Sequence, residues 1–289
     1  MFKTLKMLAS LSPAERETIA SGQFAGDFTV EALLDQMRTL ARFDASNDAT
    51  RATLKKWLGT SIVAMFASLW FTFMFGIALA VLALLSLAAA IYFGVTLRRL
   101  TKFDISNNFR EVALPFLTIL KQDMEPHQTL SVRVDLRAPT HDKKRRGTPA
   151  SSKRGAYTKI IDTTYHDDWF HGTARLADAS ILRWSVVDDL VESKRTKRSS
   201  SGKMKTKTRN YKRSTVAVSL SVSSKRYGVA GNARAEGQKI AVQGGAKRRV
   251  IKLTRKIKTK SLDPMEPDVL IDSVASAYRN VVAPARSAA

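Results

Sequence analysis

The pattern of apolar and polar positions changes twice along the chain. Residues 1–54 place apolar side chains at helical spacing, residues 55–99 hold a long apolar stretch, and the region after residue 127 follows the two-residue period of β-strands. We therefore expect an α+β membrane protein. Its parts are a cytoplasmic helical segment (1–54), a transmembrane hairpin (55–99), a juxtamembrane helix (100–126), a basic β domain (127–263), and a C-terminal amphipathic helix with a tail (264–289).

The apolar stretch from Trp57 to Leu97 contains no charged residue. Because one helix crosses a bilayer with about 20 residues, this stretch is too long for a single span. It predicts two helices, about 57–75 and 77–97, that turn near Gly76. A re-entrant hairpin in one leaflet is the alternative.

Basic residues flank both outer ends of this stretch, and none lies at its turn. Under the positive-inside rule this places both termini in the cytoplasm, most simply at a bacterial inner membrane. The stretch also lacks the intramembrane ionisable residues typical of carriers. Small residues at spacing four predict close helix packing, either inside the hairpin or in a homo-oligomer or membrane complex. The flanking cations are Lys55, Lys56, Arg98, Arg99 and Lys102.

Helix signals recur before the apolar stretch. Ser12-Pro13-Ala14-Glu15 is a capping box with Pro at the first helical position, so a short helix should run to Ser21. We expect a break at Gly22–Gly26 and a second, amphipathic helix from Thr29. A third helix should begin near Asp48 and run into the membrane.

The region after the membrane begins with a helix, Ser106–Asp123, which Pro115 can kink. Alternating patterns then predict antiparallel strands and turns, packed as a small sandwich or barrel. A C-terminal helix follows over Glu266–Val282. The expected strands are 129–136, 157–164, 169–176, 181–191, 239–243 and 247–258, with a loop at 141–155.

The most informative stretch is a long two-stranded ribbon, Val191–Arg198 and Lys203–Val222, joined by the loop 199–202. A turn centred on that loop places Glu192 opposite Arg209, a favourable cross-strand pair. The base of the ribbon is apolar and its tip is basic. The alternative is a disordered tip.

The net charge of +23 is concentrated in one region: residues 127–289 hold 35 Lys or Arg and 14 Asp or Glu, a difference of +21. Such a charge attracts polyanions. With no cysteine in the chain, thiolate chemistry is excluded. The residues expected to bind an anion are Lys143, Lys144, Arg145, Arg146, Lys194, Arg195, Lys197, Arg198, Lys203, Lys205 and Lys207.

The weak candidates for acid–base or metal chemistry are His166, Asp168 and His171, since His and Asp serve in both roles. Their spacing matches no specific motif, and a polar turn entering a strand explains them better. No phosphate-binding loop, nucleophile elbow or kinase motif is present. We therefore expect no enzyme, no metal and no cofactor.

Three functions fit these observations. The first is a membrane-anchored binding or scaffold protein whose basic domain engages acidic lipid headgroups or nucleic acid. The second is an oligomeric membrane effector or pore gated by an anionic ligand; in outline the chain is similar to two-helix-plus-β-barrel effectors of bacterial nucleotide-signalling defence systems. The third is an enzyme that acts on a membrane-associated anionic substrate.

Overall fold

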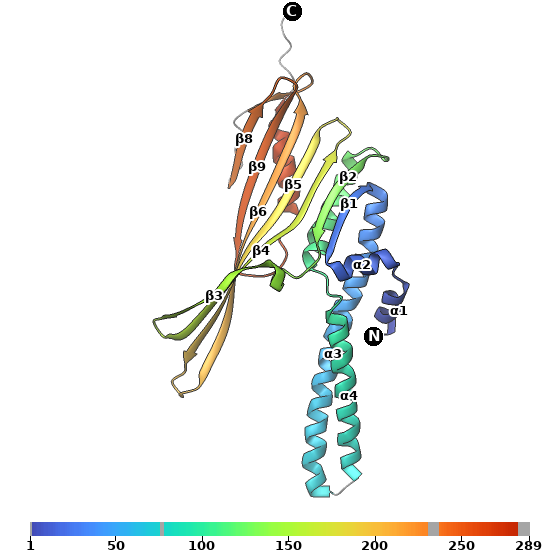
Figure 1. Ribbon diagram of the computed structural model, residues 1–289, viewed down its shortest axis with the longest axis vertical. Helices are drawn as coiled ribbons and strands as arrows, with labels where there is room; N and C mark the ends of the chain where they lie inside the picture. The colour runs from blue at the N-terminus through green and yellow to red at the C-terminus, as the bar shows by residue number, and fades with distance from the viewer. Residues whose placement is uncertain (1, 76–77, 231–236, 283–289) are drawn as a thin grey trace, which may run out of the picture. The chain divides into compact units, whose positions relative to one another are not determined.

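The computed structural model describes residues 2–75, 78–230 and 237–282 (Figure 1). The chain is α+β, as predicted, and it divides into two compact units. Unit 1 comprises residues 1–21 and 38–105, and unit 2 comprises residues 22–37 and 106–289. The turn predicted near Gly76 lies outside the described residues.

Unit 1 is helical. It contains α1 (Phe2–Ser10), α2 (Pro13–Ser21), most of α3 (Val30–Phe75) and α4 (Ala78–Thr101). The capping box predicted for α2 is confirmed by two reciprocal hydrogen bonds. The Ser12 amide donates to Glu15 Oε2 at 2.7 Å, and the Glu15 amide donates to Ser12 Oγ at 3.2 Å.

The break predicted near Asp48 is wrong, because α3 is one continuous helix of 46 residues. Polar side chains in its middle are held by neighbouring elements instead of ending the helix. Thr50 shares a 2.7 Å hydrogen bond with Thr4 of α1. The Asn47 amide donates to the carbonyl oxygens of Leu100 and Phe103, each at 3.3 Å. Because its buried amide satisfies carbonyl groups at the end of another helix, Asn47 costs little stability in the interior of α3.

One helix among the described residues is long and apolar enough to cross a membrane, the segment Leu79–Thr101 of α4. Only 11% of its most apolar window is buried, whereas the core helix of a soluble protein would be mostly buried. The predicted second span is not supported, because no second helix among the described residues meets the same criterion of length and apolarity. The apolar end of α3 is nevertheless exposed, with Val63, Phe66 and Trp70 each more than 60% accessible.

Unit 2 is built on one antiparallel sheet with the strand order β1-β2-β4-β5-β6-β9-β8, and β3 pairs with β4 beside this path. The predicted sandwich or barrel is wrong, because eight of the described strands form one open sheet with no closure and the other two form only a short separate pair. Its strands are β1 (Gln23–Thr29), β2 (Thr129–Asp135), β3 (Arg145–Arg154), β4 (Tyr157–Arg175), β5 (Ile181–Arg198), β6 (Met204–Ser223), β8 (Gln238–Gly244) and β9 (Arg248–Thr259).

Helices, rather than a second sheet, bury one face of this sheet. The segment predicted to be a kinked helix is a π-helix (Phe109–Ala113) followed by α5 (Leu114–Leu120) and a 3-10 turn (Lys121–Asp123). Phe116 of α5 packs edge-on against Phe170 and Trp184, with centroid distances of 5.9 and 5.2 Å. The amphipathic helix α6 (Asp268–Arg279) lies against β6 and β9.

Two predicted loops are strands. Residues 23–26, within the predicted break, are the first part of β1, which pairs with β2. The predicted loop 141–155 holds a 3-10 turn (Asp142–Lys144) and β3. The two strands expected at 157–164 and 169–176 are one strand, β4. A bulge at Trp169 keeps β4 in register with β5 and places Trp169 and Phe170, two consecutive residues, both in the core. A separate two-stranded pairing joins β7 (Gly228–Val229) and β10 (Val281–Val282).

Candidate polyanion site

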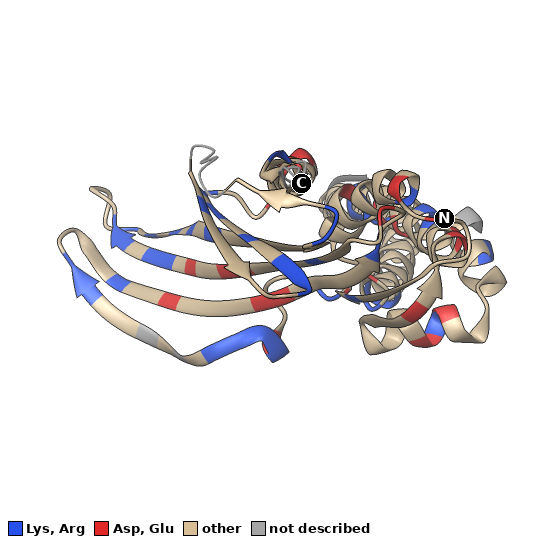
Figure 2. Cartoon of the chain, turned by 90° about the horizontal axis from the view of Figure 1, so that it is seen from above, with Lys and Arg blue, Asp and Glu red and all other residues tan. Residues whose placement is uncertain are grey.

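The long central strands extend beyond the helix-covered part of the sheet and form what we call the basic arm. It comprises Tyr157–Thr163 of β4, Val191–Arg198 of β5 and Met204–Tyr211 of β6, with Ser151–Arg154 of β3 along its edge. The predicted ribbon is therefore present. Figure 2 shows Lys and Arg recurring along these strands and near their tips.

The register of the ribbon differs from the predicted one by a single residue. Glu192 lies opposite Asn210, and Arg209 lies opposite Ser193. The reason is the loop, which spans five residues because the Ser199 amide donates to the Lys203 carbonyl before β6 begins. Since a one-residue slip moves side chains to the other face, Glu192 and Arg209 lie on opposite faces and do not neutralise each other.

Like charges lie directly opposite each other in the arm. Lys197 of β5 lies opposite Lys205 of β6. On the same face, two residues further along each strand, Arg195 lies opposite Lys207. Arg209 follows on that face, and all but Arg195 are largely exposed. Like charges opposite each other destabilise a strand pair. These rows therefore cost stability unless an anion binds across them.

Some cations of the arm already have partners. Arg195 lies over the Tyr157 ring at 5.8 Å and donates to Ser193 Oγ at 3.1 Å. The Lys194 ammonium lies 3.5 Å from Glu192 Oε2, and the Arg198 guanidinium donates a hydrogen bond to the Gly202 carbonyl at the turn. These bonds orient the side chains but leave the net charge of the tip positive. Lys203 lies in the turn itself, next to them.

The four cations at 143–146 are not brought together as one site. Arg145 pairs with Asp142 at 2.8 Å, and Lys143 and Arg146 are exposed. Lys144 is buried, and its ammonium lies 2.7 Å from Asp167 Oδ1 and 2.8 Å from the Arg137 carbonyl that accepts its hydrogen bond. It is thus already used inside the protein.

Asp167 and Lys144 belong to a buried charged group on the helix-covered face. Asp188 and Lys212, on neighbouring strands, are also buried. Burial raises the pKa of Asp167 to about 6, Lys144 opposes that rise, and Asp188 and Asp135 add to it. Burial likewise raises the pKa of Asp188 and lowers the pKa of Lys212. Charged residues inside strand patterns are the only signal of this group in the sequence.

The weak catalytic candidates form two separate pairs on the opposite face of the sheet. His171 Nε2 is hydrogen-bonded to the Asp168 carboxylate, and His166 Nδ1 is hydrogen-bonded to Asp189 Oδ1 at 2.8 Å. The first pair depends on the bulge at Trp169, which turns both side chains to one face. Neither pair is joined by a nucleophile in the described contacts. In each pair the histidine is a hydrogen-bond partner for a carboxylate on a face that is otherwise basic.

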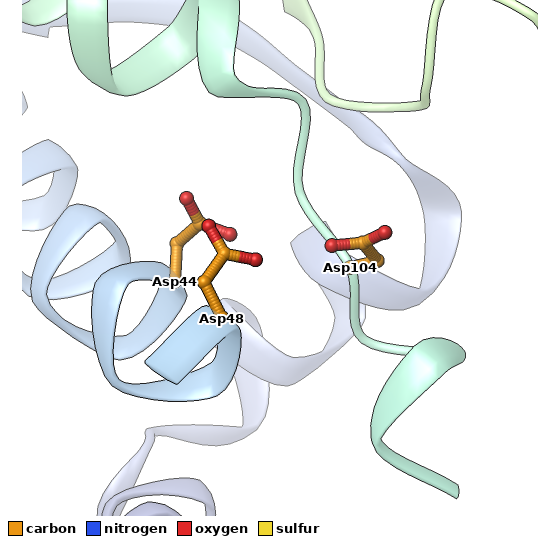
Figure 3. Close-up of side chains that lie close together, drawn as sticks. All are labelled: Asp44, Asp48 and Asp104. Carbon is orange, nitrogen blue, oxygen red and sulfur yellow. The ribbon is translucent and has the colours of Figure 1, made fainter. Parts of the chain in front are cut away.

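Unit 1 holds one cluster of acids, Asp44, Asp48 and Asp104, whose carboxylate oxygens lie within 4.8 Å of one another (Figure 3). Arg51 is bonded to Asp104 and lies 3.5 Å from Asp48. Burial raises the pKa of Asp104, and Arg51 opposes that rise. Because this guanidinium supplies the neutralising charge, we interpret the cluster as a link between α3 and the segment after α4.

Cations that sequence reasoning did not single out lie on the same face as the histidines. They include Arg133, Arg183 and Lys252, which are exposed and take part in no ion pair or hydrogen bond among the described residues. Only the two-residue strand period, applied with the correct register, could have found them.

No family model matches the chain, and neither a curated protein nor a solved structure matches it.

Proposed function

We propose that this is a membrane-anchored, non-enzymatic binding protein whose basic β unit engages an anionic partner. The observation that carries the proposal is the pair of like-charge rows in the arm, Lys197–Lys205 and Arg195–Lys207. Rows of this kind are unfavourable in the free protein and become favourable when phosphate oxygens bridge them. Acidic lipid headgroups and nucleic acid both provide such oxygens.

We propose that α4 crosses the membrane and that the end of α3 accompanies it. Only two residues separate Phe75, where α3 ends, from Ala78, where α4 begins. The uncharged stretch from Trp57 onward must therefore enter the bilayer if α4 does, because lipid does not tolerate a lone exposed turn at its centre. Its exposed large apolar side chains favour the same arrangement. Basic residues at both outer ends favour cytoplasmic termini.

Catalysis is the weaker interpretation. The candidates His166, Asp168 and His171 are engaged in two separate His–Asp pairs, and no described contact joins a nucleophile to either pair. The purified chain should therefore show no hydrolytic or transfer activity that alanine substitution of these three residues abolishes, and such a loss would favour the enzyme instead.

Charge reversal in the arm tests the proposed function. The variant Lys197→Glu, Arg198→Glu, Lys203→Glu, Lys205→Glu is titrated as the full chain in neutral lipid nanodiscs, against anionic vesicles and against duplex DNA. Since each cation near an anionic surface contributes about 1 kcal/mol, the four changes should weaken binding by up to about three orders of magnitude.

A matched variant reverses four exposed cations outside the arm, Lys225, Arg226, Lys247 and Lys260. It has the same net charge, so its smaller effect separates a local site from the general attraction of a basic protein. If the arm variant binds both probes as tightly as the wild type does, the proposed function is wrong.

A further inference from the structure

The sheet of unit 2 has one face that α5 and α6 leave uncovered, which we call the open face. The core residues Leu182, Trp184 and Val186 of β5 point to the covered face, so the residues between them point to the open face. Residues directly opposite each other in antiparallel strands share a face, so the register identifies the rest.

Two adjacent rows of the open face run across six strands, β2-β4-β5-β6-β9-β8. They contain cations, one histidine and small side chains, and no acid. The first row is Ser131, Thr173, Arg183, Ser219, Lys252 and Ala241; the second is Arg133, His171, Ser185, Ala217, Thr254 and Lys239. Small side chains therefore form a low surface, which we call the floor, and the longer Lys and Arg side chains project from it. A chain of phosphates could approach the protein backbone closely on this floor.

The floor is hollowed on both sides of Arg183. One hollow of about 290 Å³ is lined by residues of β2, β4 and β5, and another of about 240 Å³ by residues of β5, β6 and β9. Arg133 lines the first hollow, Lys252 the second and Arg183 both. Two nearby acids of this face, Asp168 and Asp189, contact histidines, and no ion pair among the described residues joins an acid to these three cations. A third acid, Asp27 of β1, lies opposite Ser131 at the end of the first row.

We propose that the open face binds the phosphodiester backbone of a nucleic acid, with no readout of the bases; this inference rests on the proposed function and names its partner. The cations continue along the face from the rows, through Arg213 and Arg209, into the arm as far as Lys205. From Ser219 to Lys205 along β6 this stripe is about 48 Å long. A single nucleotide or small messenger would occupy only a fraction of it.

Twist favours a nucleic acid over a lipid surface. Neighbouring strands rotate by about 20–25°, so the direction changes by about 80–100° over the four steps from β2 to β9. A planar bilayer can contact only part of such a face, whereas a polynucleotide can follow it. The rows contain no Phe, Tyr or Trp, and single-strand binding without sequence preference normally uses base stacking on such rings. The face therefore suits a duplex.

The test removes three charges from the floor with Arg133→Ser, Arg183→Ser, Lys252→Ser. The full chain in neutral nanodiscs is titrated with fluorescent duplex DNA of two unrelated sequences over a range of salt concentrations. Each lost phosphate contact reduces the slope of log K against log salt by about 0.9, so the slope should become shallower by about 2.7. Affinity at about 0.1 M salt should fall at least about ten-fold, equally for both sequences.

The control Lys225→Ser, Lys247→Ser, Lys260→Ser removes the same charge from exposed positions outside the strands and should change the slope by less than about one. An unchanged slope in the floor variant overturns the inference, and if the arm variant still loses binding, the proposed function stands. Binding to anionic vesicles without binding to DNA also overturns the inference alone. A wild-type protein that binds neither probe overturns both.

Discussion

The buried ion pair of Lys144 and Asp167 gives the sharpest test of the packing in unit 2. In the variant Lys144→Met, the carboxyl group of Asp167, with 1% of its side chain exposed, loses the ammonium that lies 2.7 Å away. Removing one partner of a buried pair leaves an uncompensated charge, which costs about 3–5 kcal/mol. The free energy of unfolding at pH 7.5 should fall by that amount.

The same substitution should have a smaller effect in acid. The pKa of Asp167 is about 6 in the folded protein, against 3.8 for an ordinary Asp, so folding becomes less favourable as the pH rises through this interval. A rise of this size corresponds to about 3 kcal/mol. Removing Lys144 raises the pKa of Asp167 further, so the Asp167 carboxyl group of the variant is neutral at about pH 5. The loss of unfolding free energy should then shrink to about 1–2 kcal/mol. What remains is largely the lost hydrogen bond from Lys144 to the Arg137 carbonyl.

Chemical denaturation followed by tryptophan fluorescence measures both values. Replacing Trp57 and Trp70 by Phe leaves Trp169 and Trp184, both in the core of unit 2, as the reporters. Lys143→Met, at the exposed neighbouring position, is the control and should change the unfolding free energy by less than about 0.5 kcal/mol. Equal losses at both pH values would refute the reasoning, since Asp167 would then not be a buried acid that titrates with folding.

Three further predictions concern single contacts. Gly172→Ala should destabilise unit 2 by about 3 kcal/mol, because the added Cβ would lie 2.1 Å from the Trp184 ring; a denaturation midpoint equal to that of the wild type would contradict this. Ser12→Ala should lower the stability of α2 by about 1 kcal/mol, measured as faster exchange of the Glu15 and Arg16 amides, whereas Ser10→Ala should not. Arg51→Ala should destabilise unit 1 less as the pH falls, because burial raises the pKa of Asp104 and the acid loses its charge earlier than an ordinary Asp; a thermal midpoint lowered equally at every pH would count against this.

Local signals in the sequence predicted the elements that local chemistry determines. The capping box at Ser12 and Glu15, the helix after Thr29 and the strand at 129–136 all rest on patterns a few residues long. The ribbon of β5 and β6 was likewise visible from its alternation and its basic tip. Gly22 and Gly26 predict a break between helices, because nothing local indicates that residues 23–26 pair with β2, more than a hundred residues away.

Long-range packing explains what the sequence did not predict. The bulge at Trp169 is invisible to a two-residue period, yet it merges two expected strands into β4 and brings Asp168 and His171 to one face. The loop after Arg198 is one residue longer than expected, which separates Glu192 from Arg209. Whether alternating strands form a sandwich or one sheet depends on what covers their apolar face, and here α5 and α6 do so.

The salt dependence of duplex binding by the wild-type chain tests the central claim most directly. The open face and the arm together present Arg133, Arg183, Lys197, Lys205, Lys207, Arg209 and Lys252 without acids directly opposite them. If six or more of these cations contact phosphates, log K should fall linearly with log salt with a slope of about −5 or steeper. A slope near zero, or no binding at about 50 mM salt, would contradict the claim that this β unit binds polyanions.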